Sequence, residues 1–159
     1  MKLIILISLF VLGIDILTKQ LVLNTMIEYQ SIPIINNFFS ITFAKNTGGA
    51  FSFLEGRVPL IIIMTSIVII FIIKYIKNNH INKLETICYS LVIGGAIGNL
   101  IDRIIYGYVI DFLDFNLLGY NFPIFNLADT AIVIGIILLI IFSTIESRNQ
   151  NEISKRSKN

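Results

Sequence analysis

Two aspartates, Asp111 and Asp129, carry the chemistry that this sequence suggests. Each falls where an apolar segment should leave a membrane, within Gly107–Phe112 and Phe125–Asp129. Ionisable groups at the edge of a membrane core are costly, so a pair of them predicts a functional site. Like charges held close together do not both ionise easily, and we expect them to share one proton. One carboxylate could then take a proton from water while the other protonates or hydrogen-bonds a carbonyl oxygen, which is amide hydrolysis without a covalent intermediate.

Several polar residues could support such a pair, and each also has a purely structural interpretation. Asn99 and Arg103 share one helix face and could donate to peptide carbonyls that lipid leaves unpaired. Asp102 beside Arg103 could form a plain interfacial ion pair. Asn126 is a favoured N-cap, and Asp129 would then lie in the first helical turn, where the dipole favours negative charge. The two accounts are compatible because a capped helix start holds a carboxylate rigidly.

Asp15 and Lys19, four residues apart, predict an intrahelical ion pair. Alternatively, Asp15 accepts backbone hydrogen bonds from the turn at 46–49. Gly94 and Gly98 form a small-residue face, which predicts close helix packing. Three tyrosines near the outer interface are expected to be aromatic anchors: Tyr106, Tyr108 and Tyr120.

Other catalytic arrangements fit less well. The single histidine, His80, falls in a predicted cytoplasmic loop, which excludes a Ser-His or Cys-His pair on the outer side. Ser40 or Ser52 with Lys45 would lie on an exposed hairpin, where nothing favours a neutral lysine. Cys88 is the only cysteine, which excludes a disulfide framework and predicts a buried apolar side chain.

The composition predicts a membrane protein. The chain has 159 residues, of which 55% are hydrophobic and 14% are charged, with a mean hydropathy of +0.84, whereas soluble domains average about 25% charged residues. A net charge of +2 gives no indication of nucleic-acid binding. Two carboxylates and Asn99 could hold a divalent cation, but such a site normally recruits more oxygen ligands. We therefore expect neither a metal nor another cofactor.

Four segments are long enough to span a bilayer, which takes about 20 residues: 3–23, 58–76, 86–106 and 127–145. The first has no small-residue cleavage site and is predicted to be a retained helix rather than a signal peptide. Most of the basic residues fall on the side of the two termini, which predicts that both termini are cytoplasmic. We expect one domain over 1–146, with outer loops at 24–57 and 107–126, followed by a polar tail at 147–159; disorder is expected from Glu146 onward.

The outer loops predict local structure. Phe39, Ile41 and Phe43 alternate with polar or small residues, as in a half-buried strand, and after the turn at 46–49 a second strand is predicted over 50–53. This sheet could rest on lipid or on a lipid-bearing ligand, or could merely pack on the helices. The spacing of residues 111, 112 and 115 suggests a short interfacial helix. The predicted fold is an all-α polytopic membrane protein with four transmembrane helices, a small extracytoplasmic β-sheet and a short interfacial helix.

Five motifs, each at the outer end of a predicted span, resemble those of the lipoprotein signal peptidases (signal peptidase II), which are bacterial membrane aspartyl proteases. They are Asp15 to Lys19, Asn46-Thr47-Gly48-Gly49-Ala50-Phe51, the run from Gly94 to Arg103, Gly107-Tyr108-Val109-Ile110-Asp111-Phe112, and Phe125-Asn126-Leu127-Ala128-Asp129. The only departure is Gly49, where many members have alanine.

The resemblance implies cleavage of a diacylglyceryl-modified prolipoprotein before its lipidated cysteine, at the extracytoplasmic face of the bacterial cytoplasmic membrane. It implies that Asp111 and Asp129 are catalytic, and that the loop at 107–126 forms a mobile lid. It assigns substrate binding to Asn99, Arg103, Asn126, Ala128, Asn46 and Gly95, with Asp15 and Lys19 in structural support. Membrane lipids and globomycin-type inhibitors are the other implied partners, and a monomer is expected.

Two rival functions remain. A small proton-coupled transporter subunit would also use buried acids, but it predicts carboxylates deep at the membrane midplane. A non-catalytic assembly protein would tolerate Asp→Asn at both positions.

Overall fold

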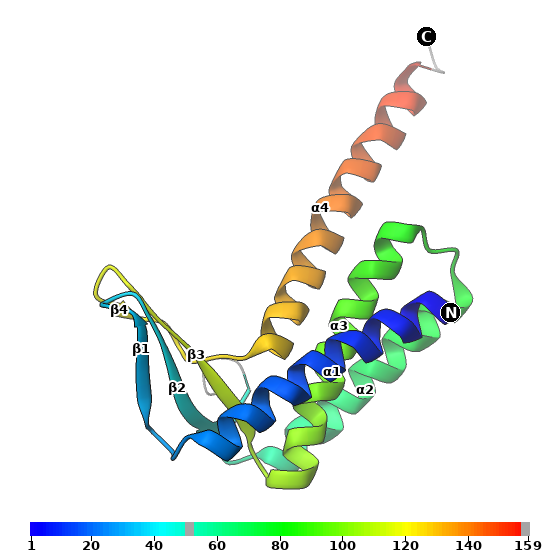
Figure 1. Ribbon diagram of the computed structural model, residues 1–159. Coiled ribbons are helices and arrows are strands. Elements are labelled where there is room, and N and C mark those ends of the chain that lie inside the picture. Colours follow the sequence, from blue (N-terminus) through cyan, green and yellow to red (C-terminus); the bar gives the residue numbers. More distant parts are fainter. Residues whose placement is uncertain (50–52, 157–159) are drawn as a thin grey trace.

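The computed structural model describes residues 1–49 and 53–156, which form four long helices and a small antiparallel sheet (Figure 1). The helices are α1 (Lys2–Thr25), α2 (Val58–Asn78), α3 (Lys83–Tyr106) and α4 (Leu127–Arg156). The strands are β1 (Ser31–Ile35), β2 (Phe39–Asn46), β3 (Val109–Leu117) and β4 (Tyr120–Asn121). The start of α1 and the end of α4 lie at one end of the bundle, and the sheet lies at the other (Figure 1).

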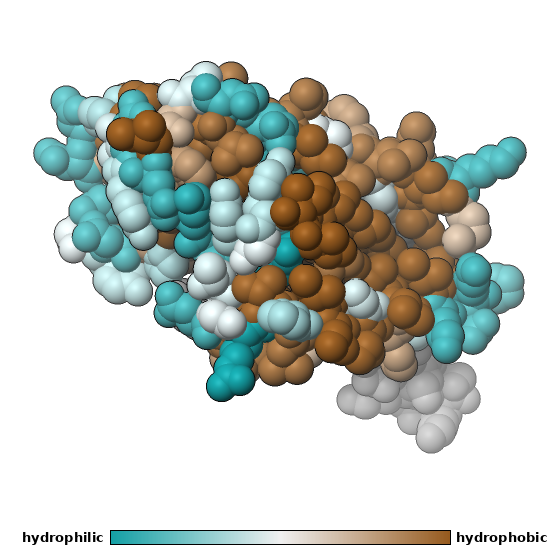
Figure 2. All heavy atoms as spheres, turned by 90° about the horizontal axis from the view of Figure 1, so that it is seen from below, coloured by the Kyte–Doolittle hydropathy of each residue, from teal (hydrophilic) through white to brown (hydrophobic). Residues whose placement is uncertain are grey.

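All four helices are long and apolar enough to cross a membrane, over 2–25, 58–78, 83–106 and 127–145. The four predicted spans are therefore confirmed. Many large apolar side chains on these helices are exposed, as a lipid-facing surface requires: Leu6, Phe10, Leu17, Phe71 and Ile140 are examples. Figure 2 shows apolar residues covering the helical part of one face, with hydrophilic residues gathered over the sheet and at the opposite end.

Helix α3 is the centre of the bundle, because it packs against α1, α2 and α4. Its glycines allow this close approach: a methyl group at Gly94 would lie 2.8 Å from the backbone oxygen of Ser8 in α1. A methyl at Gly98 would collide with the side chain of Asp15. The small-residue face that the sequence predicted is thus a helix–helix contact.

The ends of α3 follow from local sequence. Asn82 caps its start by accepting from the amides of Leu84 and Glu85, and the Glu85 side chain accepts from the Asn82 amide in return. This reciprocal arrangement is a capping box. The helix stops at Gly107, whose φ of 78° is a left-handed conformation that glycine adopts without strain. Strand β3 begins two residues later, so this turn carries the chain directly from the bundle into the sheet.

The predicted interfacial helix is wrong, because that segment forms β3 and β4. β3 pairs antiparallel with β2, with Asn46 opposite Val109 and Phe39 opposite Phe115. The edge of β2 offers backbone hydrogen-bonding groups along its length. Pairing with this edge stabilises the segment as a strand more than its weak helical pattern stabilises a helix. A tight turn through Leu118 and Gly119, both with positive φ, then leads into β4.

The strand order is β1-β2-β3-β4. β2 confirms the predicted strand, although burial does not alternate along it, because the adjacent residues Thr42 and Phe43 are both buried. β1 was not predicted, because Pro33 argues against a strand except at a sheet edge. Most of the second strand expected at 50–53 falls on residues 50–52, which lie outside the described residues; Phe53 lies in a turn before α2. α4 continues as a helix to Arg156, whereas disorder was expected from Glu146.

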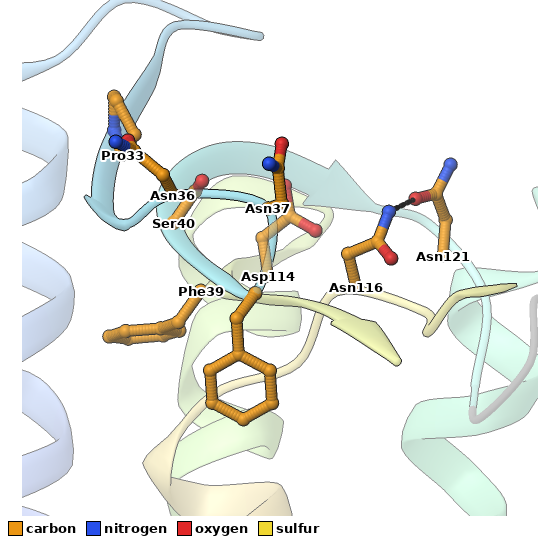
Figure 3. A pocket seen from close by; sticks show the side chains of 9 residues that line it. Pro33, Asn36, Asn37, Phe39, Ser40, Asp114, Asn116 and Asn121 are labelled. Atoms are coloured by element: carbon orange, nitrogen blue, oxygen red, sulfur yellow. Dashed lines mark hydrogen bonds between the residues drawn. The ribbon is translucent and has the colours of Figure 1, made fainter. Parts of the chain in front are cut away.

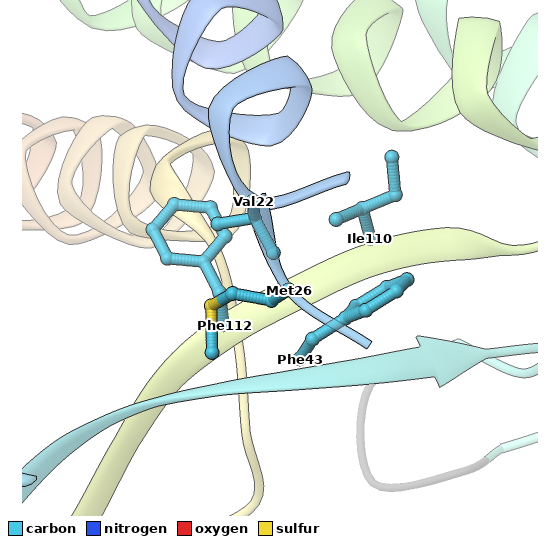
Figure 4. Packing of buried hydrophobic residues seen from close by; sticks show 5 residues of the cluster. All are labelled: Val22, Met26, Phe43, Ile110 and Phe112. Carbon is cyan, nitrogen blue, oxygen red and sulfur yellow. The ribbon is translucent and has the colours of Figure 1, made fainter. Parts of the chain in front are cut away.

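A small apolar cluster joins the sheet to the end of α1 (Figure 4). It contains Val22 from α1, Met26 just after that helix, Phe43 from β2, and Ile110 and Phe112 from β3. Ile110 and Phe112 flank Asp111, so this cluster fixes the strand that carries the first aspartate.

Gly94→Ala is expected to lower the free energy of unfolding by about 1–3 kcal/mol, because the added methyl overpacks the contact with α1. Gly13→Ala on α1 is the matched control, since a methyl there meets nothing within 4 Å. Thermal unfolding in detergent measures both. Equal stability of the two variants would contradict the close α1–α3 contact.

Candidate active site

The two aspartates reach one site from different elements. Asp111 lies on β3 and is only 2% exposed, and Asp129 lies in the first turn of α4. Both line a cavity of about 730 Å³ at the end of the bundle that carries the sheet. Asn126 joins them: its side chain donates to Asp111 (2.7 Å), and its backbone amide donates to Asp129 (3.3 Å).

Each carboxylate accepts two hydrogen bonds from asparagine residues. The side chains of Asn126 and Asn46 donate to the two oxygens of Asp111, at 2.7 and 2.9 Å. Asn99 donates to Oδ1 of Asp129 at 2.7 Å, and the backbone amide of Asn126 donates to Oδ2. Asn46, Asn99 and Asn126, all singled out in the sequence, therefore surround the pair directly.

Three donor-only groups fix the orientations of these amides. The ammonium of Lys19 donates to Oδ1 of Asn99, and the backbone amide of Gly48 donates to Oδ1 of Asn46. The backbone amide of Asp129 donates to Oδ1 of Asn126, which confirms the predicted N-cap. Each asparagine is thus left with its NH₂ group directed at a carboxylate.

Burial and charge raise the pKa of Asp111 to about 7. Desolvation by burial is the main cause, and the negative charge of Asp129 is the second. The hydrogen bonds from Asn46 and Asn126 oppose this rise without cancelling it. Asp111 therefore holds a proton into the neutral range, where an ordinary aspartate is ionised.

Arg103 lies beside the pair and is 8% exposed. Its guanidinium donates to the backbone oxygens of Gly48 (2.7 Å) and Asn99 (3.2 Å). Its Nε is buried and has no hydrogen-bond partner among residues 1–49 and 53–156. A bound molecule in the cavity could accept from such a donor.

Gly95 and Ala128 were expected to bind substrate, but neither lines the cavity; both lie in the layer behind it, with the predicted supporting residues Asp15 and Lys19. A methyl at Gly95 would collide with the backbone oxygen of Ala128, so Gly95 allows α3 to approach α4 directly behind Asp129. The backbone amide of Ala128 donates to Asp15 at 3.0 Å. The alternative in which Asp15 tethers the turn at 46–49 is therefore wrong. The predicted ion pair between Asp15 and Lys19 is present at 2.8 Å.

One further expectation needs correction, and the argument against a Ser-Lys arrangement is supported. The ion-pair partner of Asp102 is Lys19, at 2.9 Å, rather than the adjacent Arg103. Lys45 pairs with Glu28 at 2.8 Å, and this hydrogen bond raises the pKa of the lysine, so a Ser-Lys arrangement gains no neutral base.

The sequence did not identify the apolar wall of the cavity. The wall comes from the segment before α4 and from the first turns of that helix. Its residues are Phe122, Pro123, Ile124, Phe125, Ile132, Val133 and Ile134. Val133 and Ile134 are 53% and 46% exposed on a membrane-spanning helix, so the cavity continues toward the lipid. The only available signal was the apolar run on both sides of Asn126.

A second, polar cavity of about 480 Å³ lies at the sheet and holds neither aspartate of the pair (Figure 3). Four of its lining residues are asparagines, two from the turn between β1 and β2 and two from β3 and β4, and Asp114 also lines it. Asp114 accepts from the hydroxyl of Thr42 at 2.6 Å. Although it lies only three residues from Asp111, Asp114 thus belongs to a different environment.

Within the described residues, no group of three His, Cys, Asp or Glu side chains is arranged to hold a metal ion. The site instead consists of two acids, asparagine donors and one guanidinium. Such a set can bind a polar, uncharged group such as a peptide bond and move protons onto and off it.

The chain resembles known proteins over nearly its whole length. A family model described as signal peptidase II matches residues 7–145. A lipoprotein signal peptidase of Halothermothrix orenii is 45% identical over 134 residues, which cover 84% of this chain and 90% of the relative. One of Staphylococcus aureus is 40% identical over 149 residues, covering 93% and 91%.

The fold is also found among solved structures. A structure of a bacterial membrane enzyme superposes with a TM-score of 0.87 at 39% sequence identity, covering 94% of this chain and 92% of the other. A second such structure gives a TM-score of 0.80 at 40% identity. The similarity extends through the helices and the sheet that build the site, and the chain belongs to the signal peptidase II family.

Proposed function

We propose that Asp111 and Asp129 are the catalytic pair with which this protein removes signal peptides from lipid-modified prolipoproteins. As a member of the signal peptidase II family, the chain is a protease of lipoprotein precursors and a multi-pass membrane protein. The comparisons do not support a transporter. The observation that carries the proposed pair is that both carboxylates line one cavity and are linked through Asn126.

The cavity suits a substrate that is partly peptide and partly lipid. Its polar end holds the aspartates, Asn99 and Arg103, and its apolar wall leads to exposed side chains of α4. A precursor anchored by a diacylglyceryl group carries its scissile bond at the membrane surface. It would enter sideways from the bilayer, with its acyl chains along the apolar wall and its peptide between the acids.

We assign the shared proton at neutral pH to Asp111, whose pKa is raised to about 7, and Asp129 then acts as the base. Asp129 accepts a proton from water as the oxygen of that water bonds to the scissile carbonyl carbon, and Asp111 gives its proton to the carbonyl oxygen. The resulting gem-diol collapses when the C–N bond breaks: Asp129 protonates the leaving nitrogen, and Asp111 recovers its proton from a hydroxyl. Both carboxyls return to their starting states, as a catalytic cycle requires.

The surrounding donors would hold the substrate during these steps. The Nε of Arg103, which has no partner among the described residues, would donate to a substrate carbonyl, and the amides of Asn46, Asn99 and Asn126 would keep the two carboxyls in place. Ala128 and Gly95 lie behind the wall and act through packing. Lys19 and Asp15 support the site from α1.

We place this site at the extracytoplasmic face of the bacterial cytoplasmic membrane, with both termini cytoplasmic. Most basic residues lie at the end of the bundle opposite the sheet, which supports this orientation. All proposed site residues come from one chain, so a monomer in contact with membrane lipids would suffice. Cyclic lipopeptides of the globomycin type would inhibit the enzyme by occupying the same cavity.

Asp111→Asn and Asp129→Asn are each expected to reduce precursor cleavage by at least about 10³-fold, because neither variant can cycle one proton between two carboxyls. A gel-shift assay on purified protein in lipid measures cleavage, and thermal unfolding checks that the variants are folded. Asp114→Asn is the matched control: the same substitution on the same strand, outside the cavity of the pair, should leave cleavage near the wild-type rate. Normal cleavage by Asp111→Asn or by Asp129→Asn would show that the substituted aspartate is not catalytic.

Cleavage should decline as the pH rises through about 7, the pKa of Asp111. This pKa is raised, so the proton needed by the carbonyl oxygen is present below pH 7 and lost above it. Above that point, the rate should fall about tenfold per pH unit, as expected when a single proton is lost. Single-turnover rates between pH 5 and pH 9 test this expectation. A rate that stays constant to pH 9 would mean that no shared proton titrates in this range.

A further inference from the structure

The ammonium of Lys19 is buried at the junction of α1, α3 and the sheet, with only 1% of the residue exposed. It lies 2.8 Å from a carboxylate oxygen of Asp15 and 2.9 Å from one of Asp102, and it donates to Oδ1 of Asn99 at 2.9 Å. Within the described residues, the ammonium thus makes two ion pairs and one hydrogen bond. A lysine buried so completely is costly unless it is paired in this way.

The two carboxylates that contact Lys19 each accept a hydrogen bond from a backbone amide next to one of the two aspartates of the pair. Asp15 accepts from the backbone amide of Ala128, at 3.0 Å, and Ala128 immediately precedes Asp129. Asp102 accepts from the backbone amide of Ile110, at 3.2 Å, and Ile110 immediately precedes Asp111. Each proposed catalytic aspartate thus follows a residue whose amide is bound to a carboxylate of the Lys19 cluster, which we define as Lys19, Asp15, Asp102 and Asn99.

We propose that Lys19 is a positioning residue that sets the separation of the two catalytic aspartates. Through Asp15 it holds the start of α4, and through Asp102 it holds β3, so one cation fixes both backbones that carry the pair. Through Asn99 it also directs an amide donor at Asp129. This inference rests on the proposed function, because it assigns Lys19 a task only if Asp111 and Asp129 act together.

Removal of the ammonium should change the geometry of the pair rather than the fold of the helices. Asp15 and Asp102 would become two unpaired buried carboxylates that repel each other, and the backbone positions they hold would move apart. The Asn99 amide would be free to turn its oxygen toward Asp129. Lys19 is not among the residues that line the cavity, so substrate binding should change little.

The test compares Lys19→Met with the wild type, as full-length protein in lipid, with a diacylglyceryl-modified precursor as substrate. We expect kcat to fall by about 10²-fold, the order of loss that misplacement of a catalytic group by about 1 Å causes. KM should stay nearly unchanged, because the lost interaction orients reacting groups and does not bind substrate.

The pH profile gives a readout that a purely structural role would not change. The charged groups that act on Asp111 are Asp129 from α4, Arg103 from α3 and Lys19 from α1. The positive charge of Lys19 lowers the pKa of Asp111. Its removal should therefore raise that pKa and move the alkaline limb of the profile to higher pH.

Two further variants keep the inference falsifiable. Lys19→Arg retains the charge, so it should fold even if Lys19→Met does not, but its planar fork cannot reproduce three contacts from one nitrogen. It should therefore also lose kcat. Ser8→Ala is the control. It removes a buried hydrogen bond between α1 and α3, in which the Ser8 hydroxyl donates to the backbone oxygen of Ser90 at 3.0 Å. It should lower the melting temperature but leave kcat and the pH profile unchanged.

Wild-type kcat with an unshifted profile in Lys19→Met, or in Lys19→Arg if the methionine variant does not fold, would overturn the inference. An equal loss of kcat in Ser8→Ala would do the same. Asp111→Asn separates this result from the proposed function: cleavage by that variant would reject the catalytic pair itself. With Asp111→Asn inactive and the wild type active, the Lys19 variants test the positioning role alone.

Discussion

Repulsion between two buried carboxylates is the constraint around which this molecule is organised. Asp111 and Asp129 lie in a site of low polarity, where like charges interact strongly and hydration is poor. Among the described residues, neither carboxylate forms a direct ion pair. Asparagine amides surround the two acids, and Lys19 lies behind Asn99. Burial and the charge of Asp129 raise the pKa of Asp111 to about 7, although the hydrogen bonds from Asn46 and Asn126 oppose this rise.

The fold follows from the need to hold these acids at a membrane surface. One aspartate comes from a strand and the other from a helix start, so neither element alone could set their separation. Gly95 allows α3 to approach the start of α4, and the cluster around Phe43 fixes β3 against α1. In the proposed function, the apolar wall connects the acids to the lipid, so a membrane-anchored peptide would reach them without crossing water.

Much of this could be predicted from the sequence, for identifiable physical reasons. Apolar length determines the four spans, and the motif residues Asn46, Asn99 and Asn126 all reach the pair. Strand β3 could not be predicted, because its formation depends on the free edge of β2, a contact between residues far apart in the chain. The partner of Asp102 was missed for the same reason: Arg103 is adjacent in sequence, but α1 brings Lys19 to it. The apolar wall was missed because its residues look like ordinary membrane-facing positions.

The central claim is that one proton is shared between Asp111 and Asp129. Infrared difference spectroscopy with isotope-labelled aspartate, recorded on the resting protein in lipid, observes the protonated carboxyl directly. We predict a carboxylic-acid band that disappears as the pH rises through about 7 and that is altered by substitution of either aspartate. A spectrum in which all aspartates are already ionised at pH 6, or a band that neither substitution affects, would contradict the account.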